Sequence, residues 1–175
     1  MIRIPFILMA IHFCIAACGS DTIHWCNDRK LTWSDFKFNN PTGYGAATAN
    51  QILIQLIGPN DSIYAFDVHP IFLCNESWSN DTSKALLAHE QIHFDIAELA
   101  ARRIRRFLSE KIITEANYLE LYNKIRSMIA FQYETNDRFD KETGHGFLNA
   151  QQIRWRKLID SQLKALEKFS SKCPP

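Results

Sequence analysis

Residues 88–95, Ala-His-Glu-Gln-Ile-His-Phe-Asp, place two histidines four positions apart, with a glutamate directly after the first. On an α-helix a residue four positions further along is turned by only about 40°, so His89 and His93 project side by side from successive turns. Two imidazoles at this spacing can bind one metal ion, and zinc favours nitrogen ligands at about 2.0–2.1 Å. The spacing therefore predicts that His89 and His93 bind Zn²⁺.

Glu90 is placed to act on a water molecule beside such an ion. It is offset by about 100° from His89 and about 60° from His93, so it flanks the metal without binding it. Zinc lowers the pKa of its bound water toward about 7, and a nearby carboxylate can take the proton and later pass it to a leaving amine. Glu90 is therefore the predicted catalytic base of a peptide-bond hydrolase. The alternative interpretation is a chance H-E-x-x-H match on an ordinary helix.

The third zinc ligand has to come from elsewhere in the fold. Asp95 and Glu98 are turned by about 200° and about 140° from His93, so a continuous helix points both away from the metal. His145 is the favoured candidate, because Thr143-Gly144-His145-Gly146 places an imidazole on a turn with flexible backbone on both sides. An exposed turn histidine with no metal is the alternative.

Acidic residues just before His145 are the other candidate ligands, namely Glu134, Asp137, Asp140 and Glu142. If His145 binds the ion, one of Asp137, Asp140 and Glu142 is free to accept an imidazole N–H and orient the ring. We expect this supporting role for one of the three acids.

The elements around the motif change from strand-like to helical near residue 80. Before that point three runs favour β-structure, at residues 31–36, 46–57 and 62–74. The last two are separated by Gly58-Pro59-Asn60-Asp61, a strong turn signal, which predicts an antiparallel hairpin.

Beyond residue 80 the apolar residues recur at the helical spacing of three and four. We expect a helix that carries the motif and is capped by Asp81, Thr82 or Ser83, then a second helix from about Thr114 to Gly144. A third should begin near Asn149, whose side chain can cap it. Strands followed by helices predict an α+β domain. Four arginines on the first helix are expected to form a solvated face: Arg102, Arg103, Arg105 and Arg106.

The N-terminal segment has the pattern of an export signal. Residues 1–17 carry one arginine, no acidic residue and an apolar run that ends in small residues. Ile15-Ala16-Ala17-Cys18 resembles a bacterial lipobox, which predicts a lipid on Cys18 and a tether over residues 18–29. We therefore expect a cell-envelope lipoprotein, periplasmic or outer-membrane associated, anchored in the membrane through this lipid; plain secretion after Ala17 is the alternative.

The remaining cysteines and the charge balance limit the possible partners. Cys26, Cys74 and Cys173 permit one disulfide in an oxidising compartment, but the sequence does not determine which two are paired. The 20 basic and 19 acidic residues nearly cancel, and this balance gives no indication of nucleic-acid binding.

Several separated stretches resemble one bacterial family, the predicted secreted zinc-dependent proteases, which is catalogued as a domain of unknown function. The matching stretches are Leu31–Phe36, Ala46–Thr48, Glu76–Trp78, Ala88–Glu98, Ala101-Arg102, Asp137–Asp140, Glu142–Gly146, Gln152 and Trp155. The resemblance implies a zincin-like fold for a single domain over residues 30–172. It also implies that His89 and His93 bind zinc and that Glu90 is the base. The family's recurring Thr-x-His-Gly element favours His145, whereas Phe139 stands where the family often has tyrosine.

The expected function is that of a zinc-dependent metalloendopeptidase of the cell envelope, acting on a peptide or protein substrate. In zincin-like folds a strand before the active helix commonly pairs with an extended substrate, so residues 62–74 are the candidate rim. Two alternatives stay open. One is a zinc amidase that acts on cell-wall peptide, and the other is a non-catalytic, zinc-containing binding lipoprotein.

Overall fold

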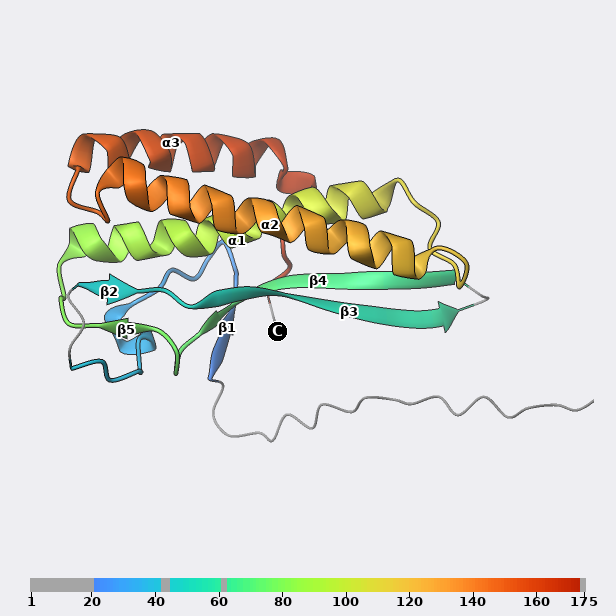
Figure 1. Ribbon diagram of the computed structural model, residues 1–175, viewed down its shortest axis with the longest axis horizontal. Helices are drawn as coiled ribbons and strands as arrows, with labels where there is room; N and C mark the ends of the chain where they lie inside the picture. Colours follow the sequence, from blue (N-terminus) through green and yellow to red (C-terminus); the bar gives the residue numbers. More distant parts are fainter. Residues whose placement is uncertain (1–20, 42–44, 61–62, 174–175) are drawn as a thin grey trace, which may run out of the picture.

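Antiparallel strands precede three long helices in the structure, a computed structural model that describes residues 21–41, 45–60 and 63–173. The elements are β1 (Thr22–His24), the 3₁₀ helix η1 (Trp33–Asp35), β2 (Ala46–Ala47), β3 (Asn50–Asn60), β4 (Ile63–Leu73), β5 (Trp78–Ser79), α1 (Lys84–Ser109), α2 (Tyr118–Thr143), α3 (Asn149–Ala165) and η2 (Glu167–Phe169). The strands lie on one side of α1, and α2 and α3 lie on its other side (Figure 1). This order confirms the predicted α+β class. The predicted signal segment 1–17 and Cys18 fall outside the described residues.

The predicted hairpin is present as β3 and β4, which pair antiparallel with Ile54 opposite Val68. The main sheet has the order β1-β4-β3, and β2 pairs with β5 in a separate two-stranded sheet. The run 46–57 is therefore two strands in different sheets rather than one. Between them, the Ala49 N–H donates to the side chain of Ser77 over 2.9 Å.

Strand β4 does not form an open rim. It lies between β1 and β3, and its carbonyls beyond β1 accept hydrogen bonds from the Trp25 N–H and from Arg105. The expectation that residues 62–74 line the substrate cleft is wrong, because both edges of β4 are covered by other parts of the chain.

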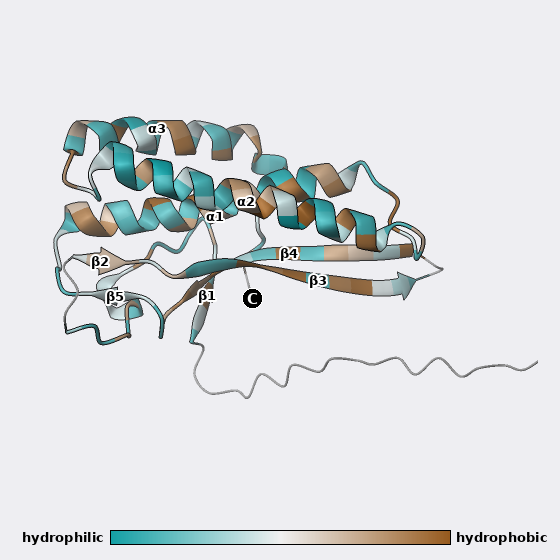
Figure 2. Cartoon of the chain, in the orientation of Figure 1, coloured by the Kyte–Doolittle hydropathy of each residue, from teal (hydrophilic) through white to brown (hydrophobic). Residues whose placement is uncertain are grey.

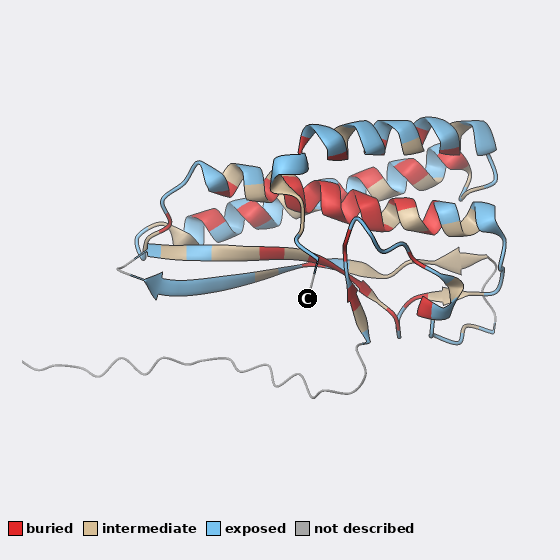
Figure 3. Ribbon diagram, turned by 180° about the vertical axis from the view of Figure 1, so that it is seen from behind, coloured by how far each residue is buried: buried red, intermediate tan, exposed pale blue. Residues whose placement is uncertain are grey.

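Helix α1 is the centre of the domain. One apolar cluster joins it to the sheet and α2, and a second joins it to α2 and α3. Its hydrophilic and hydrophobic positions alternate (Figure 2), and its middle turns are buried on most sides (Figure 3). Each large apolar side chain buried in this way contributes about 1.5–3 kcal/mol, so packing against the sheet, α2 and α3 stabilises the position of α1. No helix in the described part of the chain is both long and apolar enough to span a membrane.

The helix ends agree with most of the predicted caps. Ser83 caps α1, its hydroxyl accepting from the Leu86 N–H over 3.3 Å. Helix α2 ends at Gly144, which has a left-handed φ of 57°. Asn149 does not cap α3, because it is already the first helical residue and Leu148 precedes it.

Residues 31–36 contain the 3₁₀ turn η1 instead of a strand. The carboxylate of Asp35 accepts from the Thr32 N–H over 2.8 Å and closes the turn. A local side-chain acceptor of this kind competes with strand pairing, and the aromatic composition of the run does not reveal it.

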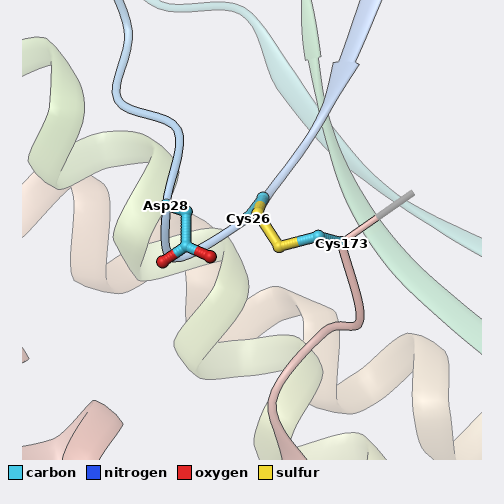
Figure 4. A group of neighbouring side chains, drawn as sticks. All are labelled: Cys26, Asp28 and Cys173. Carbon is cyan, nitrogen blue, oxygen red and sulfur yellow. A yellow bond between two sulfur atoms is a disulfide. The ribbon is translucent and has the colours of Figure 1, made fainter. Parts of the chain in front are cut away.

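The N-terminal segment enters the fold at Thr22. Residues Thr22–His24 pair with β4, and Trp25 is 2% exposed. Cys26 forms a disulfide with Cys173, while Cys74 is free and buried. Figure 4 shows this disulfide beside Asp28. The stretch expected as a tether is thus anchored to the domain from Thr22 onward, and the disulfide ties it to the C-terminal end.

Candidate metal centre

The imidazoles of His89 and His93 lie side by side on α1, as the helical spacing predicts. Their Nε2 atoms are 3.2 Å apart. The side chain of His89 is 3% exposed and that of His93 is 12% exposed. The two Nε2 atoms therefore lie next to each other in a part of the domain with little solvent exposure.

Asp140, from the last turn of α2, brings a carboxylate to the same point. Its Oδ1 lies 3.0 Å from His89 Nε2 and 3.1 Å from His93 Nε2. The neighbouring Phe139 is fully buried and stacks on the His89 ring, with the two ring centroids 4.4 Å apart. Packing of Phe139 against α1 thus places Asp140 over the two imidazoles.

The outer nitrogen of each imidazole contacts an amide oxygen. His89 Nδ1 lies 3.0 Å from Gln152 Oε1, and His93 Nδ1 lies 2.9 Å from Asn136 Oδ1. The Gln152 amide nitrogen donates to the Ala85 carbonyl, which determines the orientation of that amide. An amide oxygen only accepts, so both Nδ1 atoms donate. With Nδ1 as donor, a protonated Nε2 donates to Asp140, whereas an Nε2 that has given up its proton presents its lone pair to a metal ion.

The charges of the cluster favour a cation at its centre. Burial acts to lower the pKa of His93, but the hydrogen bond and charge of Asp140, with the charge of Glu90, outweigh it and raise that pKa. Burial acts to raise the pKa of Asp140, but its hydrogen bonds to His89 and His93 outweigh it and hold the pKa far below its usual range. The three groups are electrically complementary to a proton or a metal ion between them.

The donor set fits zinc. Two imidazole nitrogens and one carboxylate oxygen are ligands that zinc prefers in catalytic sites, and tetrahedral ligands at 2.0–2.1 Å are about 3.3 Å apart. The three atoms found here are separated by 3.0–3.2 Å. His89, His93 and Asp140 also form a metal-compatible group by the spacing of their ligand atoms. The second such group, Cys26, Asp28 and Cys173, contains the disulfide and so lacks free thiolates.

His145 lies near this cluster but is not one of the three converging groups. Its Nδ1 is 3.8 Å from Asp140 Oδ1, and its side chain is 77% exposed. The structure therefore brings Asp140, one of the acids named as alternatives to His145 for the third ligand, to the two histidines. Metal binding by His145 stays a prediction. Neither of the other proposed supporting acids contacts the two imidazoles: Asp137 is exposed, and Glu142 accepts from the Trp155 indole over 2.8 Å.

Sequence reasoning missed the two amides that hold the imidazoles. One signal was present for Asn136, which precedes Asp140 by four residues and so lies on the same face of α2. Gln152 belongs to the stretches that carry the family resemblance, but no local spacing relates it to His89, because it lies on a different helix.

Glu90 is a buried acid that follows His89 on α1. It is 2% exposed, it lines the cleft beside the cluster, and its Oε2 has no hydrogen-bond partner among the described residues. By contrast Asp95 and Glu98 point away from the cluster. Asp95 accepts from the Trp25 indole, and Glu98 accepts from Arg102.

A cleft of about 790 Å³ opens over the cluster. Three segments line this cleft. They are residues 45–48 with strand β2, the start of α1, and the turn at Gly146 and Phe147. Among the described residues, strand β2 is paired only with β5. Phe147 is 90% exposed and lines this cleft, so an apolar side chain is available there to contact a ligand.

The comparisons with known proteins give a match to part of one family model and no function. Residues 74–146 match the family described as "Bacterial protein of unknown function (DUF922)". This range contains Glu90 and the three converging residues. Neither the search of curated proteins nor the search of solved structures found a match.

Proposed function

We propose that this chain is a zinc-dependent metalloendopeptidase of the bacterial cell envelope. The observation that carries the proposal is the convergence of His89, His93 and Asp140 within 3.2 Å of one another, beside a buried carboxylate. A site with only a structural metal has no use for an unpaired acid next to it.

Zinc held by His89, His93 and Asp140 would act as a Lewis acid that acidifies water and polarises a carbonyl. The protein's own residues would do the remaining chemistry. With zinc bound, Gln152 and Asn136 would accept from Nδ1 of the two imidazoles and so keep each Nε2 free for the metal, as outer-sphere partners of zinc ligands commonly do.

Glu90 is the proton carrier in this proposal. Its unpaired Oε2 can accept a proton from water as the water oxygen bonds to the amide carbon. When the C–N bond breaks, the same carboxyl group returns the proton to the leaving nitrogen. Burial strengthens these interactions, because the surroundings screen charge less than water does.

The cleft suits an extended peptide. Strand β2 lines it and, in the part of the chain that the structure describes, has a strand partner on one side only. A peptide can therefore add to β2 by backbone hydrogen bonds, a common mode of peptide recognition. This support replaces the earlier expectation for residues 62–74.

Location in the envelope is supported by the Cys26–Cys173 disulfide, because such bonds persist in oxidising compartments. We propose that Cys18 carries the lipid anchor. Labelling of cells with a fatty-acid probe should mark the wild-type chain and fail in Cys18→Ala. Equal labelling of both would exclude Cys18, and the chain would then be a candidate for plain secretion.

The decisive experiment compares the full wild-type chain with Glu90→Gln on a mixed peptide library that includes cell-wall peptides. Cleavage should stop with a chelator and fall by about 10²–10⁴-fold in Glu90→Gln, with zinc content unchanged. Glu76→Gln, which changes an exposed glutamate, is the control and should retain activity.

Two other outcomes would point elsewhere. One zinc per chain with no cleavage that depends on Glu90 would favour a non-catalytic binding lipoprotein. Cleavage confined to the sugar–peptide amide bond of the cell wall would favour a zinc amidase.

A further inference from the structure

Strand β3 is an edge strand with an open side. It spans Asn50–Asn60, and in the order β1-β4-β3 it has β4 on one side and, within the described residues, no strand on the other. The outward-pointing N–H and C=O groups of such an edge are a template for pairing with another strand.

This edge lacks the usual protection. Its sequence, Asn-Gln-Ile-Leu-Ile-Gln-Leu-Ile-Gly-Pro-Asn, contains no charged residue, and the middle of the strand is hydrophobic (Figure 2). Leu53, Leu56 and Ile57 are 40%, 38% and 49% exposed. Natural edge strands are commonly short or carry lysine or proline, which blocks pairing. Here the only proline, Pro59, lies near the tip, so residues 50–57 remain competent to pair.

The two faces of β3 have different characters. Ile52 and Ile54 pack with the apolar cluster of α1. The alternating residues Gln51, Leu53 and Gln55 are exposed and therefore lie on the opposite face. A strand that pairs with β3 would therefore contact Ile52 and Ile54 on one face. On the other face it would contact Leu53 and the amide side chains of Gln51 and Gln55.

The chain itself supplies a strand of this description. Residues 51–55, Gln-Ile-Leu-Ile-Gln, read the same in both directions. If two copies pair antiparallel about Leu53, Ile52 of each copy faces Ile54 of the other. In the same register Gln51 faces Gln55, and no like charges meet. Cross-strand apolar pairs and matched amides are the contacts that stabilise antiparallel sheets.

We propose that two copies of this chain associate through their β3 edges, antiparallel and centred on Leu53. The two three-stranded sheets become one continuous sheet of six strands, three from each copy. The contact is isologous, so each copy covers the other's open edge and the assembly closes at two. This inference does not depend on the proposed peptidase activity.

The oligomeric state is tested on the full chain by sedimentation equilibrium in density-matched detergent. The wild type should be a dimer. Leu53→Lys places two like charges at the two-fold axis and should raise the dissociation constant by about tenfold or more. Ile153→Lys changes a residue of α3 that is 50% exposed, against 40% for Leu53, and should leave the dimer intact. Circular dichroism should show that both variants are folded.

The register is tested by cysteine cross-linking on non-reducing gels. Leu53→Cys should give a disulfide-linked dimer, because position 53 faces itself. Gln55→Cys alone should not, but it should cross-link to Gln51→Cys when the two variants are expressed together. A monomeric wild type, larger open aggregates, a dimer that survives Leu53→Lys, or equal cross-linking of Gln55→Cys and Leu53→Cys would each overturn the proposal.

Discussion

His89 Nδ1 lies 3.0 Å from Oε1 of Gln152, although 63 positions separate the two residues in the chain. The amide nitrogen of Gln152 donates to the Ala85 carbonyl on α1. Gln152 therefore connects α3 to the turn that carries the first histidine, and it determines which nitrogen of that imidazole faces Asp140.

Replacing Gln152 with leucine should weaken zinc binding. The loss of its amide oxygen frees the His89 ring to rotate and to change tautomer, and loss of such partners typically costs 10–100-fold in metal affinity. Competition with a chromophoric chelator measures the change. Gln151→Leu is the control. It changes the preceding residue but leaves Gln152 and its contact with His89 in place, so this variant should bind zinc like the wild type. Equal affinities of all three proteins would mean that Gln152 does not orient His89.

Asp140→Asn and His145→Ala separate the two candidates for the third ligand. Asp140 Oδ1 lies within 3.1 Å of both Nε2 atoms, so Asp140→Asn should lower zinc affinity by more than about 100-fold, beyond the loss expected for an outer-sphere partner. His145→Ala should change it by about threefold at most, because that side chain is largely exposed. The reverse ranking would make His145 the ligand.

Gly146→Ala should disturb the centre through a tight contact on a strained backbone. A Cβ at this position would lie 3.2 Å from Gln152 Oε1 and 3.3 Å from His89 Cγ, on a backbone with φ of 88°. We expect a loss of about 1–3 kcal/mol in the free energy of unfolding, together with weaker zinc binding.

Gly45→Ala is the matched control for this change. It has a similar φ of 83°, but its nearest contact would be Leu86 Cδ2 at 3.9 Å. It should therefore show the backbone cost alone, with zinc affinity preserved. If both variants lose zinc equally, backbone strain rather than contact with His89 is responsible.

Removal of the Cys26–Cys173 disulfide should destabilise the domain. The bond closes a loop of 147 residues, and loss of a native disulfide costs about 2–5 kcal/mol. Thermal unfolding of the double variant Cys26→Ser, Cys173→Ser should give a lower Tm than the wild type. A reductant should lower the Tm of the wild type and leave that of the double variant unchanged. Sensitivity of the double variant to reductant would point to a different bond.

Features that depend on local geometry could be predicted from the sequence. The side-by-side placement of His89 and His93, and the exclusion of Asp95 and Glu98, follow from the helical repeat within one uninterrupted helix. Ser83 and Gly144 were predicted as helix ends because capping and left-handed turns depend on neighbouring residues. The hairpin of β3 and β4 was predicted from its turn signal in the same way.

Features that depend on side chains from separate elements were not predicted. Arg102 was expected to be solvated, but it is 4% exposed and pairs with the buried Glu98. Periodicity shows which residues share a face of α1 but not what covers that face. Here α3 and the C-terminal segment cover it, and Arg102 donates to the Leu163 carbonyl and to Ser170.

The sequence by itself determined the two histidines and the acid beside them, because four residues of helix place these groups without help from the rest of the chain. Only the tertiary structure decided what joins them. The ends of α2 and α3 reach α1 through the packing of Phe139 and Trp155 in one apolar cluster. That packing sets Asp140 rather than His145 over the imidazoles and brings Gln152 behind His89. Because such contacts join residues about 50 or more positions apart, their geometry depends on the whole core and is not contained in any local spacing.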